Sequence, residues 1–354
     1  MQLKQLTNTN GILIGIISAF LFGLATPFSK VLLSSINEFQ LAGLLYIGAG
    51  IGVFPMLIKK DGCFLFRKEK ITYTKKHIIS LVGIIFTGGF LAPIILLFGL
   101  KTAQASSVAI WLNMELVATA VLGTLFFKEH LGRNGWIGVI LTLAAGVILA
   151  FSEGMSGAAS ALLVTTACIF WGLDNHLTSI IDSMSPSEVT FIKGIFAGVV
   201  NLIIGCIISG YSISVYYIII ALLVGAFSYG ISILLYIISS QNIGATRGQI
   251  LFSTAPVFSI IISLIFLGES FTYFQLISII LIFIGVYFST VLYHEHKHKH
   301  MANEHVHLHS HDDSHHLHYH KDLGQNIKHT HLHSHKKMDH AHIHYPDIHH
   351  RHDH

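Results

Sequence analysis

Glu115, Asp174 and Lys193 are ionisable residues that lie inside long apolar runs of the 354-residue sequence. A charged side chain at the centre of a bilayer costs a few kcal/mol at least, so it normally faces the interior of a helix bundle and marks a substrate or proton pathway. Glu115 and Asp174 are therefore predicted to bind protons or a cationic substrate. The alternative is a protonated carboxyl that hydrogen-bonds a neighbouring helix as structural glue. Lys193 suits either a counter-charge to these carboxylates or a group that binds a substrate anion.

The polar and aromatic neighbours of the two carboxylates complete the candidate site. They are Trp111, Asn113, Trp171, Asn175 and His176. Each tryptophan lies about one helical turn before a carboxylate, where side chains share a face, so both are expected to shape a cavity. His176 is two positions from Asp174, so a helix would point it elsewhere, and a structural role fits it at least as well.

The runs that carry these residues are typical of membrane spans. Hydrophobic residues make up 52% of the chain and charged residues only 11%, against about 25% charged in soluble domains. A span needs roughly 20 apolar residues, and ten such segments lie near 11–33, 39–58, 78–100, 104–127, 135–152, 158–181, 188–209, 214–239, 245–267 and 272–293. The sequence predicts an all-α integral membrane protein with ten transmembrane helices.

Loop charges predict the orientation. The loop 59–77, "KKDGCFLFRKEKITYTKKH", carries seven Lys or Arg residues, whereas the connections near 153–157, 210–213 and 268–271 carry none. Basic loops stay in the cytoplasm, so both termini are expected there, in a multi-pass protein of the inner (cytoplasmic) membrane. The first span lacks a cleavage site and is expected to be an uncleaved helix.

The two halves of the membrane part repeat each other. "KTAQASSVAIWLNMELVATAVLGTLFFKEHL" (101–131) aligns without gaps on "QNIGATRGQILFSTAPVFSIIISLIFLGESF" (241–271). Glu129 thereby matches Glu269, and capping or packing is the expected role of both. Five spans in each repeat is an odd number, so the second copy must be inverted, an arrangement typical of secondary transporters with a midplane site. The expected domains are residues 1–152, residues 153–293 and a tail, 294–354.

This arrangement resembles the EamA-type permeases of the drug/metabolite transporter superfamily. The resemblance covers about residues 11–293 and is carried by two five-helix halves, each with an "F-x-x-E" motif before a Gly-bearing last helix. "STAPVFSIIISLIFLGESF" is similar to the usual fourth helix of an EamA half, and the first half departs from it, with Glu115-Leu116 in place of Ala255-Pro256. The resemblance implies transport of a small metabolite, without naming the substrate.

The tail has a different composition from the rest. It holds all but three of the 26 histidines, and its Lys and Arg residues are nearly balanced by Asp and Glu. Alternating histidines are candidate ligands for Zn, Ni or Co, and so few apolar residues predict a disordered segment without metal. A solvating, pH-sensitive linker is the alternative. The candidate ligands are His294, His296, His298, His300, His305, His307, His309, His311, His316, His318, His320, His329, His331, His333, His335, His340, His342 and His344.

The leading hypothesis is a secondary transporter that moves a small metabolite or amino acid by alternating access, with proton coupling as an option and the tail as a metal-binding accessory. A divalent metal (Ni, Co or Zn) transporter and a non-transporting membrane metal sensor are the alternatives. The sequence has no P-loop, nucleophile elbow or H-E-x-x-H motif, so an enzyme is not expected. Transport is expected to need no cofactor, and the partners are a small-molecule or cation substrate and the lipid bilayer, with no nucleic acid. A homodimer stays open.

Overall fold

The computed structural model describes most of the membrane part and four short pieces of the tail. The described residues are 2–61, 75–127, 131–181, 184–243, 248, 251–290, 297–300, 303–309, 329–335 and 338–341, with side chains described only within 10–58, 75–127, 131–181, 184–240, 248 and 251–288. Residues 1–292 and 293–354 form two separate compact units.

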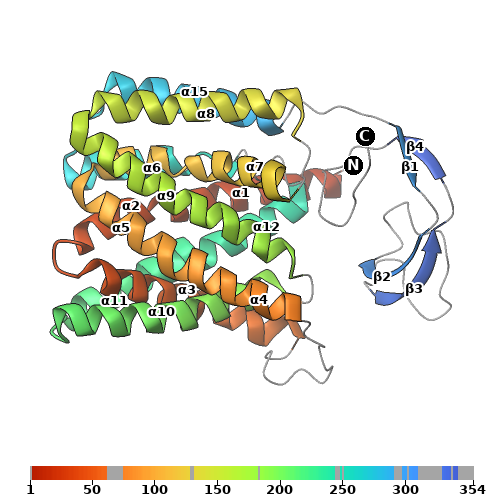
Figure 1. Cartoon of the computed structure of the whole chain (residues 1–354), viewed down its shortest axis with the longest axis horizontal. Coiled ribbons are helices and arrows are strands. Elements are labelled where there is room, and N and C mark those ends of the chain that lie inside the picture. Colours follow the sequence, from red (N-terminus) through yellow and green to blue (C-terminus); the bar gives the residue numbers. More distant parts are fainter. Residues whose placement is uncertain are drawn as a thin grey trace. The chain divides into compact units, whose positions relative to one another are not determined.

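The membrane unit is a bundle of helices (Figure 1). Its first half contains α1 (Gln2–Gly23), α2 (Ala25–Leu32), α3 (Glu38–Asp61), α4 (Lys75–Ile84), η2 (Ile85–Leu91), α5 (Ala92–Thr102), α6 (Ala105–Trp111), α7 (Met114–Phe126) and α8 (Arg133–Ser152). Its second half contains α9 (Gly154–Ser179), α10 (Pro186–Ser209), α11 (Val215–Val224), η3 (Gly225–Ile231), α12 (Ser232–Ile243), α14 (Ala255–Ile262), η4 (Ser263–Leu267) and α15 (Tyr273–Thr290). Here η denotes a π-helical segment.

Eight of the ten predicted spans are confirmed as helices of membrane-spanning length. Among the described residues, eight helical segments are long and apolar enough to cross a membrane, and the shorter apolar helices Ala255–Leu267 and Tyr273–Phe288 occupy the ninth and tenth positions. The third span is longer than predicted, Lys75–Thr102, and the sixth begins earlier, at Gly154. The membrane unit is thus all-α, and the chain is a multi-pass membrane protein.

The two halves share a π-helical turn at the same place, as well as their helices. In the first half α4, η2 and α5 run on as one rod from Lys75 to Thr102, and in the second half α11, η3 and α12 do the same from Val215 to Ile243. Each element of the second rod begins 140 residues after its counterpart in the first, which is the offset of the sequence repeat. A π-helical turn widens a helix and is frequent at functional sites.

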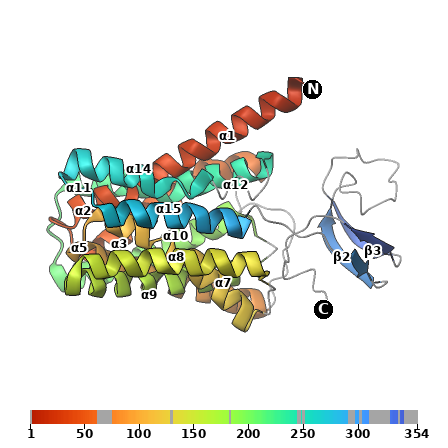
Figure 2. The ribbon, with the colours of Figure 1, turned by 90° about the horizontal axis from the view of Figure 1, so that it is seen from above.

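Equivalent helices from the two halves pack against each other. Helix α3 packs along α10, and α8 lies side by side with α15, as Figures 1 and 2 both show. Glycines permit the first of these close approaches: a Cβ on Gly194 would lie 2.6 Å from the Tyr46 carbonyl oxygen, and one on Gly198 would lie 2.9 Å from that of Gly43. Small residues at helix contacts let backbones approach in this way.

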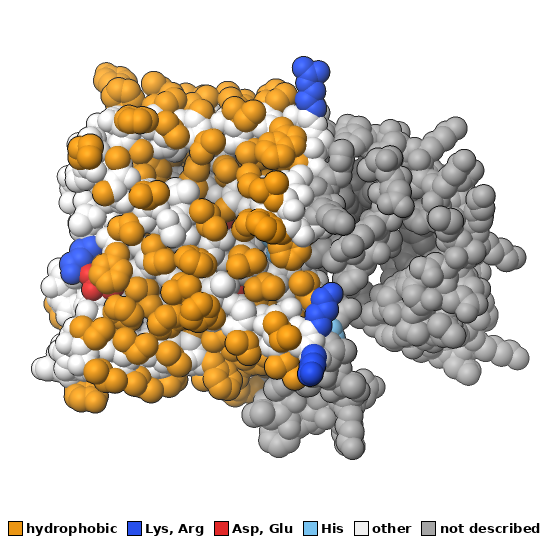
Figure 3. All heavy atoms as spheres, in the orientation of Figure 1, with side chains coloured by type: hydrophobic (Ala, Val, Ile, Leu, Met, Phe, Trp, Pro, Cys, Tyr) orange, Lys and Arg blue, Asp and Glu red, His pale blue; other side chains and the backbone are white. Residues whose placement is uncertain are grey.

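The outer surface of the bundle is apolar. Figure 3 shows hydrophobic side chains over the face seen there, with charged groups confined to its edges. Large side chains such as Phe151, Ile140 and Leu162 are more than half exposed. Because a soluble protein rarely exposes so continuous an apolar surface, these side chains are expected to face lipid.

The tail contains paired strands where the sequence predicts disorder. Strands β1 (Lys297–His300) and β4 (Met338–Ala341) form one antiparallel pair, and β2 (Asn303–His309) and β3 (His329–His335) form another. The sequences NEHVHLH and HTHLHSH alternate histidine with other residues, and a period of two fits the pleat of a strand.

Candidate functional site

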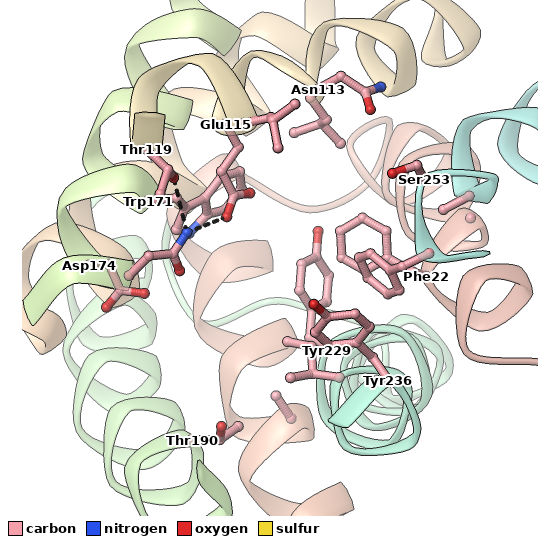
Figure 4. Close-up of a pocket in the computed structure, with 18 of the residues that line it drawn as sticks. Phe22, Asn113, Glu115, Thr119, Trp171, Asp174, Thr190, Tyr229, Tyr236 and Ser253 are labelled. Carbon is pink, nitrogen blue, oxygen red and sulfur yellow. Dashed lines mark hydrogen bonds between the residues drawn. The ribbon is translucent and has the colours of Figure 1, made fainter. Parts of the chain in front are cut away.

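A cavity of about 610 Å3 lies between the two halves of the membrane unit. Its polar and aromatic walls are drawn in Figure 4. The lining comes from α1 to α3, α6 and α7 in the first half, and from α9, α10, η3, α12 and α14 in the second. Six of the eight predicted site residues line it: Asn113, Glu115, Trp171, Asp174, Asn175 and Lys193. The repeat interface therefore holds a cavity lined by most of the predicted site residues.

Asp174 and Lys193 form an ion pair in the wall of the cavity. Lys193 Nζ donates to Asp174 Oδ2 at 2.7 Å, and the side chains are 18% and 6% exposed for Lys193 and Asp174, respectively. Lys193 stands two turns into α10, whose start is fixed by a capping box: Ser185 Oγ accepts from the Glu188 amide, and Glu188 accepts from the Ser185 amide. Of the two roles predicted for Lys193, this geometry matches the counter-charge.

Gly88, at the centre of η2, organises this wall. Its carbonyl oxygen accepts hydrogen bonds from Tyr46 Oη at 2.5 Å and from Trp171 Nε1 at 3.1 Å. A Cβ added to Gly88 would lie within 2.6 Å of both Asp174 carboxylate oxygens. Only glycine at this position lets the carboxylate pack directly on the rod, so η2 sets the position of Asp174, Trp171 and Tyr46 together.

Glu115, in α7, contacts the residue that follows Asp174 in α9. Asn175 Nδ2 donates to Glu115 Oε1 at 2.8 Å and approaches Thr119 Oγ1 at 3.3 Å (Figure 4). Spans four and six thus meet at the two predicted carboxylates. Asn113 caps the start of α7 without a side-chain capping bond, and its Nδ2 donates to the Ile110 carbonyl at 3.0 Å.

Five aromatic rings in mutual contact form a second wall, here called the aromatic wall. Its members are Tyr46, Tyr229, Phe22, Phe252 and Tyr236. The ring centroids lie 6.3 Å apart for Tyr46 and Tyr229, and 6.1 Å for Phe22 and Tyr229. Phe252 lies 4.9 Å from both Phe22 and Tyr236. Figure 4 shows Phe22, Tyr229 and Tyr236 across the open space from Glu115 and Trp171.

Two predicted site residues do not line the cavity. Trp111 is completely buried, and its Nε1 donates to the Gly146 carbonyl of α8 at 3.2 Å. The prediction assumed one continuous helix, but turn residues Leu112 and Asn113 separate α6 from α7 and change the face. His176 donates from Nε2 to the Thr119 carbonyl at 2.9 Å and stacks on Phe127, which matches the structural role considered for it.

Among the described residues, the lining of the cavity reaches one end of the bundle. Its lining reaches Thr178 and Pro186, beside the ends of α9 and α10. This is the end at which α4 and α8 begin with Lys75 and Arg133, and it is called the basic end below. In the other direction the cavity stops near Thr26, whose Oγ1 lies 2.5 Å from the Ser259 hydroxyl.

Two lysines hold the opposite end together. Lys30 Nζ donates to the carbonyl oxygens of Leu100, Lys101 and Ala103 at 2.7–2.9 Å, at the C-terminus of α5. Lys101 Nζ forms a 2.6 Å ion pair with Glu38, at the start of α3. Cations are stabilised at helix C-termini, where carbonyl groups lack partners within the helix.

Carboxylates hold the next connection at the same end. Glu269 accepts from the amides of Ala105 and Ser106 at 2.6 and 3.0 Å, and from the Ser106 hydroxyl at 2.6 Å. The predicted capping role of Glu269 is confirmed, while Glu129 lies outside the described residues. Glu153 accepts from the Ser107 hydroxyl. Burial raises the pKa of the Glu153 carboxyl, the bond from Ser107 opposes this, and the charge of Glu269 adds to it.

No metal cluster occurs in the part of the chain whose side chains the structure describes. There, no three His, Cys, Asp or Glu side chains lie close enough together to hold an ion. The tail histidines predicted as ligands have no described side chains.

Comparison of the sequence with known proteins identifies the family. The model of the EamA-like transporter family matches residues 9–151 and 158–291, one match for each half. This chain is a member of the EamA-like transporter family. Relatives include an "uncharacterized transporter" from Methanothermobacter thermautotrophicus, 30% identical and aligned over 77% of this chain and 84% of its own. Another is the "uncharacterized transporter YyaM" of Bacillus subtilis, 25% identical over 66% of this chain and 76% of its own.

A solved structure supports the fold. A crystal structure 16% identical in sequence superposes with a TM-score of 0.57 and covers 80% of this chain and 98% of its own. The family and the relatives together show that this protein is a membrane transporter with a small-molecule substrate.

Sequence reasoning missed Gly88 and the aromatic wall. Tyr46 and Tyr229 lie inside predicted spans, where a phenol needs a polar partner or a cavity, so they carried a usable signal. Gly88 carried none, because 31 glycines are spread through the chain.

Proposed function

We propose that this EamA protein is a secondary carrier that moves a small organic metabolite by alternating access. The observation that carries the proposal is a central cavity that reaches one end of the bundle while hydrogen bonds hold the other end closed. Inverted repeats with a site at their interface are the arrangement by which carriers exchange the open end. The conformation described here is one of the two such states.

An organic substrate fits the cavity better than a divalent metal. Asp174 is neutralised by Lys193, and the aromatic wall contributes no metal ligands except phenols. A hard or borderline cation needs several oxygen or nitrogen ligands converging on one point. Glu115, whose carboxylate accepts a hydrogen bond from the Asn175 amide and forms no ion pair with the described residues, is the group that we assign to proton or cation exchange.

We place the basic end in the cytoplasm of a cell with the carrier in its inner membrane, and with it both termini. Positive charge in the loops supports this orientation. The described state would then be open to the cytoplasm.

Transport assays in proteoliposomes test the carrier. Vesicles containing the purified protein are loaded with amino acids and other small metabolites, with and without a proton gradient, and exchange is measured. Glu115→Gln should abolish exchange while circular dichroism shows intact helices, and Thr166→Val, in α9 but outside the cavity lining, should retain it. Absence of any exchange by the wild-type protein across such a panel contradicts the proposal.

The tail is proposed as a metal-binding accessory. The register of β2 and β3 supports it, since His305, His307 and His309 stand opposite His333, His331 and His329, respectively. Calorimetric titration with Zn²⁺ and Ni²⁺, compared between the whole chain and a truncation after Tyr293, tests this assignment. Equal metal binding by the two forms would contradict the assignment of the tail as the metal-binding segment.

A further inference from the structure

Among the described residues that line the cavity, the ionisable ones leave one negative charge unbalanced. They are Glu115, Asp174 and Lys193. Lys193 is held by Asp174 at 2.7 Å. Asn175 donates to Glu115 at 2.8 Å but carries no charge, and none of the lysines or arginines with described side chains forms an ion pair with Glu115. An ionised carboxylate removed from water needs a cation or a proton beside it.

The same wall also has unused hydrogen-bond acceptors. Asp174 Oδ1 is buried and accepts no hydrogen bond from the described residues. Only one oxygen of Glu115, Oε1, accepts a bond there. Leaving a buried acceptor unpaired is costly, so a ligand with several N–H donors would gain more from this wall than one with acceptors only.

The aromatic wall faces these acceptors. Phe22, Tyr229 and Tyr236 lie across the cavity from Glu115 (Figure 4). Ring faces attract cations, and more strongly where water is excluded. They also provide apolar contact for the uncharged body of a ligand. Both walls therefore favour the same kind of molecule.

We propose that the cavity binds a small organic cation, a protonated amine with an apolar body, whose ammonium group lies between Glu115 and the aromatic wall. This inference rests on the proposed carrier function and specifies its substrate class. A zwitterionic amino acid would need a cation for its carboxylate, and Lys193 is already paired with Asp174. An anion would meet the excess negative charge of the lining.

Four ligands of similar shape but different charge test the assignment. Phenethylamine is a cation, phenylalanine a zwitterion, hydrocinnamate an anion and phenethyl alcohol neutral. Equilibrium dialysis of radiolabelled phenethylamine against the full-length protein in detergent, with the others as competitors, gives their relative affinities. The amine should bind about tenfold or more tightly than each of the others, as expected for a charge-assisted hydrogen bond.

Single-residue variants test whether Glu115 is the source of the preference for the amine. Glu115→Gln should reduce the affinity for phenethylamine to that for phenethyl alcohol, whereas Thr166→Val, outside the cavity lining, should leave it unchanged. If Glu115→Gln does not fold, the charge series on the wild-type protein decides alone. Equal or tighter binding of phenylalanine or hydrocinnamate overturns the inference.

Exchange in vesicles separates this inference from the carrier proposal. A protein that exchanges phenylalanine but neither binds nor exchanges the amine remains a carrier and overturns the cation assignment. A protein that binds the amine tightly but exchanges no ligand retains the cation site and overturns the carrier.

Discussion

Breaking the Asp174–Lys193 pair should destabilise the protein strongly, and removing both charges should not. The side chains are 6% and 18% exposed and are joined at 2.7 Å. Removing one member of a buried pair leaves the other charge uncompensated and typically costs about 3–5 kcal/mol, whereas replacing both by neutral groups is often nearly neutral. Asp174→Asn and Lys193→Met should therefore each lower the free energy of unfolding by about that amount, and the double variant by less than either.

A second ion pair in the same molecule is the matched control. Glu38 and Lys101 are joined at 2.6 Å; the Lys101 side chain is 56% exposed and that of Glu38 is 4% exposed. Because water reaches Lys101 and screens this pair, Glu38→Gln, Lys101→Met and their combination should each cost less stability than the corresponding changes at Asp174 and Lys193. Unfolding by a denaturing detergent, followed by circular dichroism, gives the two double-mutant cycles. Additive effects at Asp174 and Lys193, or effects no larger than those of the control pair, would refute the argument from burial.

Three further predictions concern the rod and the closed end. Gly88→Ala should abolish exchange in proteoliposomes and cost about 1–3 kcal/mol from overpacking, while Gly83→Ala, where a Cβ meets only the flexible end of a leucine at 2.7 Å, should do neither. Glu269→Gln should speed hydrogen exchange of the two α6 amides that it caps by about tenfold, since charged acceptors bind more strongly; an unchanged rate would exclude Glu269 as a stabiliser of that end. The raised pKa of Glu153 means that its protonated form is favoured in the folded protein, so the associated stability is complete below the ordinary value of 4.5 and is lost as pH rises through the raised pKa. The unfolding temperature of the wild type, relative to Glu153→Gln, should thus fall as pH rises above 4.5, and parallel curves for the two proteins would contradict this.

The architecture could be predicted from the sequence because it follows from long-range periodicity. Ten apolar runs, an offset of 140 residues and Glu115, Asp174 and Lys193 as intramembrane charges are visible without coordinates, and all three charged residues line the cavity. The cost of charge in lipid leaves such residues few places to lie.

The features that could not be predicted from the sequence depend on interruptions in the helices. Counting turns puts Trp111 on the face of Glu115, but the break at Leu112 and Asn113 lets the Trp111 side chain point to α8, where it bonds the Gly146 carbonyl. The importance of Gly88 depends on the π-helical turn η2 and on contacts with Asp174 and Trp171. Neither a π turn nor a contact between distant spans has a periodic signature.

The repeats are alike in backbone but unlike in charge. Glu115 of the first half corresponds to Ala255 of the second in the 140-residue alignment, and Gly88 corresponds to Ser228. The two halves share one backbone and are inverted relative to each other. When the bundle opens at the opposite end, each half can therefore take the conformation that the other half has now. A charge carried by one half alone removes the twofold equivalence of the binding site. We therefore expect the carrier to hold its substrate in a single orientation, with the same end of the molecule on Glu115 whichever side of the membrane is open.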